Sequence, residues 1–128
     1  MRGIPMATPP ADLLIFGDIN VDVLARLRAP LVPLGDNLPP ALEMHLGGVG
    51  ANTAVAAARW GFRVRLMGCV GRDWFGDFAL RRLANNGVDF SGVARVGQPT
   101  GLICIPVNPD GQRTIIGSRG ANACAPAG

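Results

Sequence analysis

The chain has 128 residues, enough for one domain or for part of a larger one. Hydrophobic residues make up 48% of it and charged residues 16%, which is too apolar for intrinsic disorder. The net charge of +3 comes from arginines spread along the chain, without the basic stripe of a nucleic-acid-binding protein. No apolar run reaches the roughly 18 residues of a membrane span, and the three cysteines form no metal-binding C-x-x-C pair. We therefore expect a cytoplasmic protein that binds neither nucleic acid nor membrane.

The first predicted element follows a short N-terminal extension. Residues 1–11 are rich in proline and alanine, and we expect them to be disordered, with the folded domain over residues 12–128. The apolar run Leu13–Phe16, ended by Gly17, predicts a strand buried on both faces of a parallel sheet.

Polar side chains alternate with apolar ones directly after this strand. If the backbone stays extended, Asp18, Asn20 and Asp22 lie on one face. Carboxylates accept hydrogen bonds from hydroxyl groups, and an amide both donates and accepts, so the cluster suits a polyol or sugar, although Asp18 and Asn20 could equally cap turns. A calcium-binding EF-hand loop is excluded, because Val23 and Ala29 occupy the positions where that loop needs Gly and Glu.

The later elements alternate between strand and helix patterns. Helices are expected at 51–60 and 76–86, and strands at 43–46, 63–70, 101–107 and 112–118, the last two joined by a turn at 108–111. Alternating strands and helices predict an α/β fold with a parallel sheet. Pro106 cannot donate a backbone hydrogen bond, which places its strand at a sheet edge.

A glycine-rich motif precedes the first predicted helix. Gly47, Gly48 and Gly50 would let the backbone approach a ligand closely, next to the free N–H groups of the helix start, although tight turns alone would need the same glycines. As a nicotinamide dinucleotide fingerprint the motif is weak, because Thr53 stands where a third small residue is needed.

Several spaced motifs together resemble one family. The glycine motif with Asn52 and Ala54 is joined by motifs at 17–22, 70–76, 87–89, 100–101, 108–111 and 120–123. In this order they resemble the N-terminal portion of the ribokinase-like (PfkB) carbohydrate kinases, over nearly all of residues 12–125. The resemblance implies a three-layer α/β fold with a parallel sheet and a small β-lid, formed by segments near 19–46 and 100–118.

The resemblance also implies site residues. By similarity, the substrate-binding residues are Asn20, Asp22, Gly47, Gly48 and Asn52, whereas His45 is expected to be structural or solvated. Many ribokinase-type members have Lys where this chain has Val49, so ketoses, sugar acids and nucleosides stay open beside ribose as substrates.

The family transfers the γ-phosphate of ATP to a sugar or nucleoside hydroxyl, and its members use ATP and Mg²⁺. The family's catalytic Asp, its anion hole and its ATP-binding elements belong to a C-terminal half, which implies that this chain holds no catalytic, cofactor or metal residue. We therefore expect the isolated chain to be an inactive, truncated substrate-binding and lid portion. A homodimer through the β-lid is a further expectation, and a non-catalytic sugar-binding or interaction module is the alternative.

Overall fold

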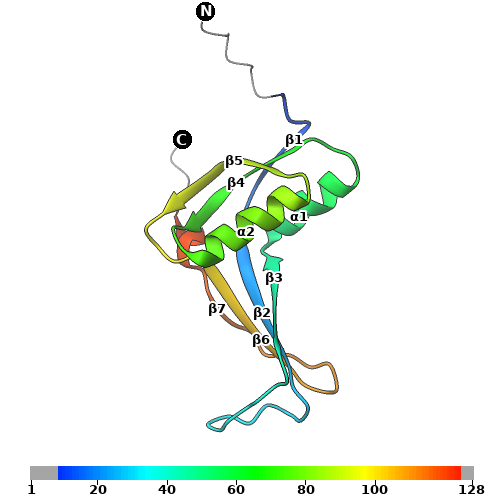
Figure 1. Cartoon of the computed structure of the whole chain (residues 1–128), viewed down its shortest axis with the longest axis vertical. Coiled ribbons are helices and arrows are strands. Elements are labelled where there is room, and N and C mark those ends of the chain that lie inside the picture. The colour runs from blue at the N-terminus through cyan, green and yellow to red at the C-terminus, as the bar shows by residue number, and fades with distance from the viewer. Residues whose placement is uncertain (1–8, 125–128) are drawn as a thin grey trace, which may run out of the picture.

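The computed structural model describes residues 9–124, which form two sheets and two helices. Residues 1–8 and 125–128 lie outside the described part, so most of the expected N-terminal extension is not tested. Figure 1 shows a helix-covered sheet from which a second sheet extends away. The predicted α/β class is confirmed.

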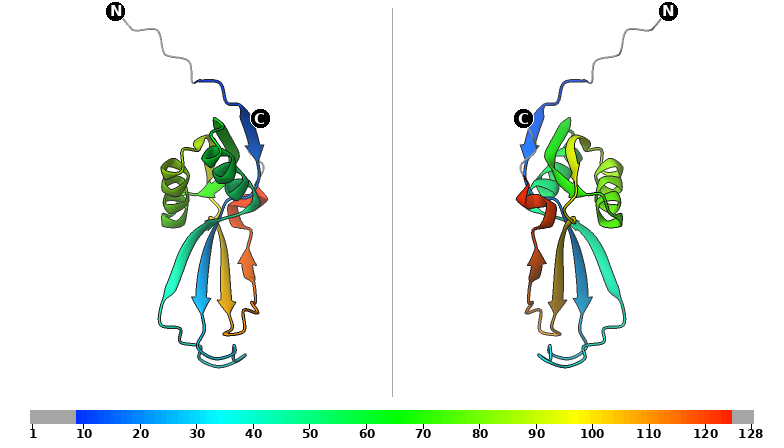
Figure 2. Two further views of the ribbon diagram at one scale, coloured as in Figure 1. Left: turned by 90° about the vertical axis from the view of Figure 1, so that its right-hand side faces the viewer. Right: turned by 90° about the vertical axis from the view of Figure 1, so that its left-hand side faces the viewer.

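The first sheet is parallel and carries both helices on one face. It contains β1 (Leu13–Phe16), β4 (Val64–Gly71) and β5 (Asp89–Val96) in the order β1-β4-β5. The helices are α1 (Val49–Arg59) and α2 (Trp74–Asn85). Helix α2 connects the parallel strands β4 and β5, whereas α1 leads into β4 from the second sheet. Figure 2 shows both helices on the same side of the parallel sheet.

The second sheet, called here the outer sheet, has four strands. They are β2 (Asn20–Arg26), β3 (Leu42–Gly47), β6 (Gly101–Val107) and β7 (Ile116–Ser118), in the order β3-β2-β6-β7. The central pair β2–β6 is parallel and the two outer pairs are antiparallel. A short 3-10 helix, η1 (Gly120–Ala123), follows β7.

The position of Pro106 corrects one expectation, since β6 lies between β2 and β7 and is not an edge strand. The proline is tolerated because the ladder to β7 covers only Leu102–Cys104 and ends two residues before it.

The core lies between the parallel sheet and the helices. Leu66 and Val70 of β4 and Leu83 of α2 are fully buried there, as are Ile19 and Val21 where the chain enters the outer sheet. The predicted helix residues Phe78 and Leu80 pack against this core, partly buried. The central strand β4 is therefore the most buried strand, which its apolar sequence predicts.

Strand β1 is parallel as predicted, but it is not buried on both faces. Leu14 is 65% exposed and Phe16 68% exposed. These two side chains alternate along β1 with Ile15, which packs against the core, so they point to the sheet face that neither α1 nor α2 covers.

The chain changes sheets at Gly17–Ile19, which corrects the predicted alternation. Strand β1 ends at Phe16 and β2 begins at Asn20 in the other sheet. Asn20 and Asp22 share a strand, whereas Asp18 precedes it, with its carboxylate 3.7 Å from the guanidinium of Arg119.

Candidate functional site

The site is built on one face of the outer sheet, close to its junction with the helices. Residues paired across neighbouring strands project to the same face of a sheet. Asn20 pairs with Gly47 of β3 and Gly101 of β6, and Asp22 pairs with His45 and Ile103. This face, called here the polar face, therefore carries Asn20 and Asp22 side by side along β2.

The Asp22 carboxylate lies directly against the backbone of Gly47. A Cβ atom added to Gly47 would overlap both carboxylate oxygens, so any side chain there would displace the Asp22 carboxylate from its position. Gly47 is buried, and Asp22 is half-buried. The structure thus brings together two of the residues that sequence predicts for the substrate site.

Burial also sets the charge balance of Asp22. Loss of solvent raises the pKa of its carboxyl group above the ordinary value, and the nearby His45 lowers it by a smaller amount. The ionised form of this carboxylate is therefore less favourable in the folded chain than in water. Hydrogen bonds from a bound molecule would compensate for the lost solvation.

Gly48 joins the polar face to the start of α1. Its φ of 92° lies in the left-handed region, and a Cβ there would overlap the carbonyl of Asp18. It is the N-cap residue of α1, without a side-chain cap, and the Ala51 N–H donates to the Asp18 carbonyl at 3.2 Å. The helix start is thereby held against the entry to β2.

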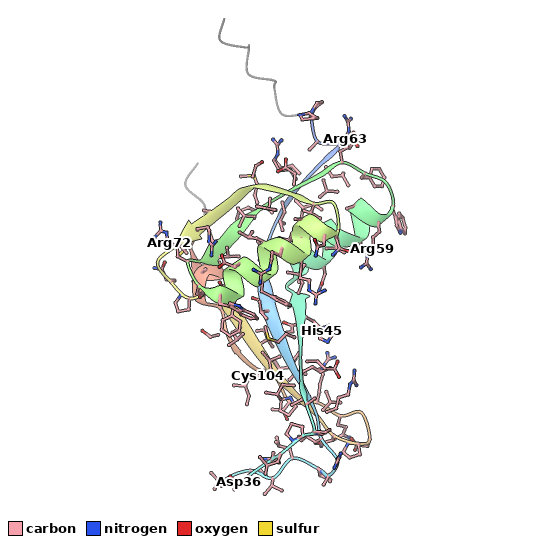
Figure 3. The ribbon with its side chains drawn as sticks, in the orientation of Figure 1. Asp36, His45, Arg59, Arg63, Arg72 and Cys104 are labelled. Carbon is pink, nitrogen blue, oxygen red and sulfur yellow. The ribbon has the colours of Figure 1, made fainter. Side chains whose placement is uncertain are left out.

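Asn52 lies on the first turn of α1 and is exposed. It lines a cavity of about 400 Å³ together with His45, Arg59 and Arg82, and Asp22 is not part of this lining. Figure 3 shows His45 and Arg59 on this side of the molecule. The described residues therefore bring Asn20, Asp22, Gly47 and Gly48 together but do not enclose Asn52 in one cavity with Asp22.

His45 is a solvated residue in the structure. Its side chain is 56% exposed and its Nε2 lies 3.2 Å from a carboxylate oxygen of Glu43, which in turn accepts from Arg26. This exposure agrees with the solvated alternative of the two that the sequence analysis left open for His45.

Asn122 of η1 is a polar residue of the site that sequence reasoning did not assign. Its side chain bonds the backbone of Ile19 through both amide atoms, and its Nδ2 donates to Asn20 Oδ1 at 2.7 Å. The only signal in the sequence was the motif at 120–123, which carries no indication of its partner more than 100 residues away.

The connection before β6 is fixed by a second network. Asp73 accepts from the Thr100 hydroxyl at 2.7 Å and from the Thr100 N–H at 2.9 Å, and it caps α2 by accepting from Gly76 N–H at 2.8 Å. Burial alone would raise the pKa of Asp73, but these hydrogen bonds outweigh it and lower the pKa. The network places Gly101, the first residue of β6, beside Asn20.

Across residues 9–124, no three His, Cys, Asp or Glu side chains gather closely enough to hold a metal ion. Neither helix in the described part of the chain has the length and hydropathy of a membrane span.

Comparison with known proteins places this geometry in a family. The model of the pfkB family carbohydrate kinases matches residues 10–127. The ribokinase of Schizosaccharomyces pombe is 33% identical over 120 residues, which cover 87% of this chain and 37% of that protein.

Solved structures agree with that assignment. The ribokinase of Arabidopsis thaliana, complexed with ribose and ATP, has a TM-score of 0.79 and 27% identity over 88% of this chain and 37% of its own. A fructokinase of Xylella fastidiosa has a TM-score of 0.68 and 37% identity over 84% of this chain and 32% of its own. The chain thus spans about 37% of the length of the first curated relatives that it matches. On these matches, and on the sheet topology that accompanies them, the chain belongs to the pfkB family of carbohydrate kinases.

Proposed function

We propose that residues 12–128 form the substrate-binding and lid portion of an ATP-dependent sugar kinase. The observation that supports this most directly is the contact of the Asp22 carboxylate with the Gly47 backbone on the polar face, next to the left-handed Gly48. A half-buried carboxylate beside a bare stretch of backbone offers acceptors and N–H donors to adjacent hydroxyl groups. The outer sheet would be the lid, and a sugar would lie against its polar face.

The individual roles follow from the chemistry of each group. Asp22 accepts hydrogen bonds from sugar hydroxyls, Asn20 bonds a neighbouring hydroxyl, and Gly47 and Gly48 let the sugar approach the main chain. Asn52, on the first turn of α1, contacts the sugar when the bound sugar extends from the polar face to the start of that helix. The acceptor is a pentose or a ketose, since ribokinases and a fructokinase are both among the similar proteins; sugar acids and nucleosides are the alternatives that the resemblance leaves open.

Phosphoryl transfer would need groups that the described residues do not supply. The reaction depends on positioning the phosphate and neutralising its charge. Asp73 and Asp77 are engaged in hydrogen bonds to Thr100 and Arg95, so neither is a free general base. We therefore assign ATP and Mg²⁺ to the family's reaction but to no residue of this chain, and we expect the chain alone to be inactive.

Two assays test this function. Calorimetric titration with ribose and fructose, without nucleotide, should show binding that Asp22→Ala abolishes and the matched surface change Asp36→Ala leaves intact; Asp36 is an exposed residue at the far end of the outer sheet (Figure 3). Binding that survives Asp22→Ala would refute the site. A coupled ATP-consumption assay should show no turnover by the chain alone, and clear turnover would refute the inactive-portion proposal.

The opposite face of the outer sheet supports a homodimer. Val23, Cys104 and Ile116 share this face by strand register, and they line an apolar depression of about 240 Å³ together with Leu42 (Cys104 is labelled in Figure 3). Burying such exposed aliphatic side chains against a second copy would contribute about 1.5–3 kcal/mol each.

Sedimentation measures this dimer directly. Ile116→Glu is expected to give a monomer, whereas the matched Trp60→Glu, at an exposed residue after α1, keeps the dimer. Equal sedimentation of the two variants would contradict a dimer through this face.

A further inference from the structure

The backbone of Ile19 determines which amide atom of Asn122 is the oxygen and which is the nitrogen. A peptide N–H can only donate, and a peptide C=O can only accept. The N–H of Ile19 lies 2.9 Å from one amide atom of Asn122, and the carbonyl of Ile19 lies 3.1 Å from the other. The first atom must therefore be Oδ1 and the second Nδ2, because the reverse assignment would leave a donor facing a donor and an acceptor facing an acceptor.

This fixed amide orients the next one. Asn122 Nδ2 also lies 2.7 Å from the side chain of Asn20, and since Nδ2 only donates, the facing atom of Asn20 must be the acceptor Oδ1. The Nδ2 group of Asn20 is then the outward end of its amide. Among residues 9–124, none accepts a hydrogen bond from it.

Gly101 provides the space for this contact. A Cβ atom there would overlap both Asn122 Nδ2 and Asn20 Oδ1, so the hydrogen bond passes over the bare glycine. Gly101 is buried at the start of β6, opposite Asn20 in the parallel ladder. Three separate segments, at Ile19, Gly101 and Asn122, therefore meet around the side-chain amide of Asn20.

We propose that Asn122 is a positioning residue that holds Asn20 with its oxygen inward, so that the polar face presents an N–H donor from Asn20 beside the Asp22 acceptor. This rests on the proposed function, and it defines the recognition: a sugar with two neighbouring hydroxyls, one accepting from Asn20 Nδ2 and the other donating to Asp22. Asn122 itself touches no substrate.

The amide orientation is measured without any ligand. In the ¹⁵N,¹³C-labelled chain, a magnetic-resonance correlation across the hydrogen bond should connect Asn122 Nδ2 to Asn20 Cγ. The correlation from Ile19 N to Asn122 Cγ serves as the internal control in the same spectrum. A correlation from Asn20 Nδ2 to Asn122 Cγ, or a visible control without the expected correlation, overturns the proposal.

Sugar binding provides the second readout. Asn122→Ala and Gly101→Ala are expected to weaken ribose binding about tenfold, the effect of one misplaced hydrogen bond. The matched control Gly97→Ala adds a Cβ where nothing lies within 4 Å and should bind like the parent chain. Asn20→Asp keeps the inward oxygen but presents an acceptor in place of the donor, and it should lose ribose binding.

Deoxy sugars separate positioning from a general structural effect. Among the deoxy derivatives of ribose, the one that lacks the hydroxyl accepting from Asn20 Nδ2 should bind the parent chain about tenfold more weakly than ribose. In Asn122→Ala and in Asn20→Ala, removal of that same hydroxyl should cost nothing further. A full deoxy penalty in Asn122→Ala overturns the positioning role. If the parent chain binds no sugar, the proposed function fails, while the ligand-free correlation still decides the orientation of Asn20.

Discussion

The parallel sheet and the outer sheet differ in how deeply they bury their side chains. In β4, Leu66 and Val70 are fully buried between a neighbouring strand on each side and the helices above. In the outer sheet, Leu42 and Ile116 are each 63% exposed. Stability therefore comes mainly from the helix-covered sheet, while the outer sheet exposes one polar and one apolar face to other molecules. The proposed sugar site lies at the junction between the helix-covered parallel sheet and the outer sheet.

A matched pair of leucine-to-alanine substitutions, one in each sheet, should give the largest difference in stability between the two regions. Leu66→Ala removes fully buried methyl groups and should lower the free energy of unfolding by about 2–5 kcal/mol. Leu42→Ala removes mostly exposed ones and, at a concentration where the chain is monomeric, should cost less than about 1 kcal/mol. Urea unfolding followed by circular dichroism measures both. Equal losses would contradict the division of stability between the sheets.

Asp73→Asn tests the network that connects the two regions. The Nδ2 group of the substituted side chain would face the Thr100 N–H, so that two donors would meet. We expect the free energy of unfolding to fall by about 1–3 kcal/mol at pH 7. Because the folded-state pKa is lowered, the carboxylate stabilises the fold above its ordinary pKa, and this contribution is lost as pH falls through the folded value. Unfolding free energies measured from neutral to acid pH should therefore converge for parent and variant. A difference independent of pH would mean that the charge of Asp73 is not the cause.

Asp22→Asn should have the opposite effect on stability, although it lies on the outer sheet. The raised pKa means that the ionised group destabilises the fold, and this cost is complete above the folded-state pKa. The cost decreases as pH falls from the folded value toward the ordinary pKa and is gone below the ordinary pKa. The variant should thus be as stable as the parent chain at neutral pH, or more stable by up to about 1 kcal/mol, while it loses ribose. Thermal unfolding at pH 7, paired with calorimetry, measures both quantities. A marked destabilisation would show that Asp22 maintains the fold instead of a site.

Asp12→Asn should have the smallest effect. Asp12 pairs with Arg63 at 2.7 Å across the starts of β1 and β4, and this hydrogen-bonded pair lowers the pKa of Asp12 to about 2. Both side chains are solvated, so water and salt screen the attraction. The melting temperature should fall slightly at low salt and match the parent at high salt. A loss that persists at high salt would be inconsistent with a screened surface pair.

Local patterns predicted the elements that depend on neighbouring residues. The turn at 108–111 is present, with Gly111 N–H donating to the Asn108 carbonyl at 2.9 Å. Both helices begin two residues earlier than predicted, at Val49 and Trp74, because their N-caps are Gly48 and Asp73. Strand β5 was not anticipated, since Ser91 and Gly92 interrupt its apolar pattern.

Features that depend on distant segments could not be predicted from periodicity. The exposure of Phe16 arises because α1 and α2 both lie against the other face of the parallel sheet, which no local pattern encodes. The contact between Asp22 and Gly47 depends on the register of β2 with β3, and the bond from Asn122 to Asn20 joins residues 102 positions apart. The resemblance to a family supplied the candidate residues, but their contacts required the fold.

One titration tests the central claim, that Asn20, Asp22, Gly47 and Gly48 form one sugar-binding face. Ribose added to the ¹⁵N-labelled chain should shift the backbone amide resonances of these four residues and the side-chain amide of Asn20. Gly111, in the turn after β6, should not shift. Shifts confined to the apolar face, at Val23 and Cys104, or no shifts at saturating ribose, would contradict the account.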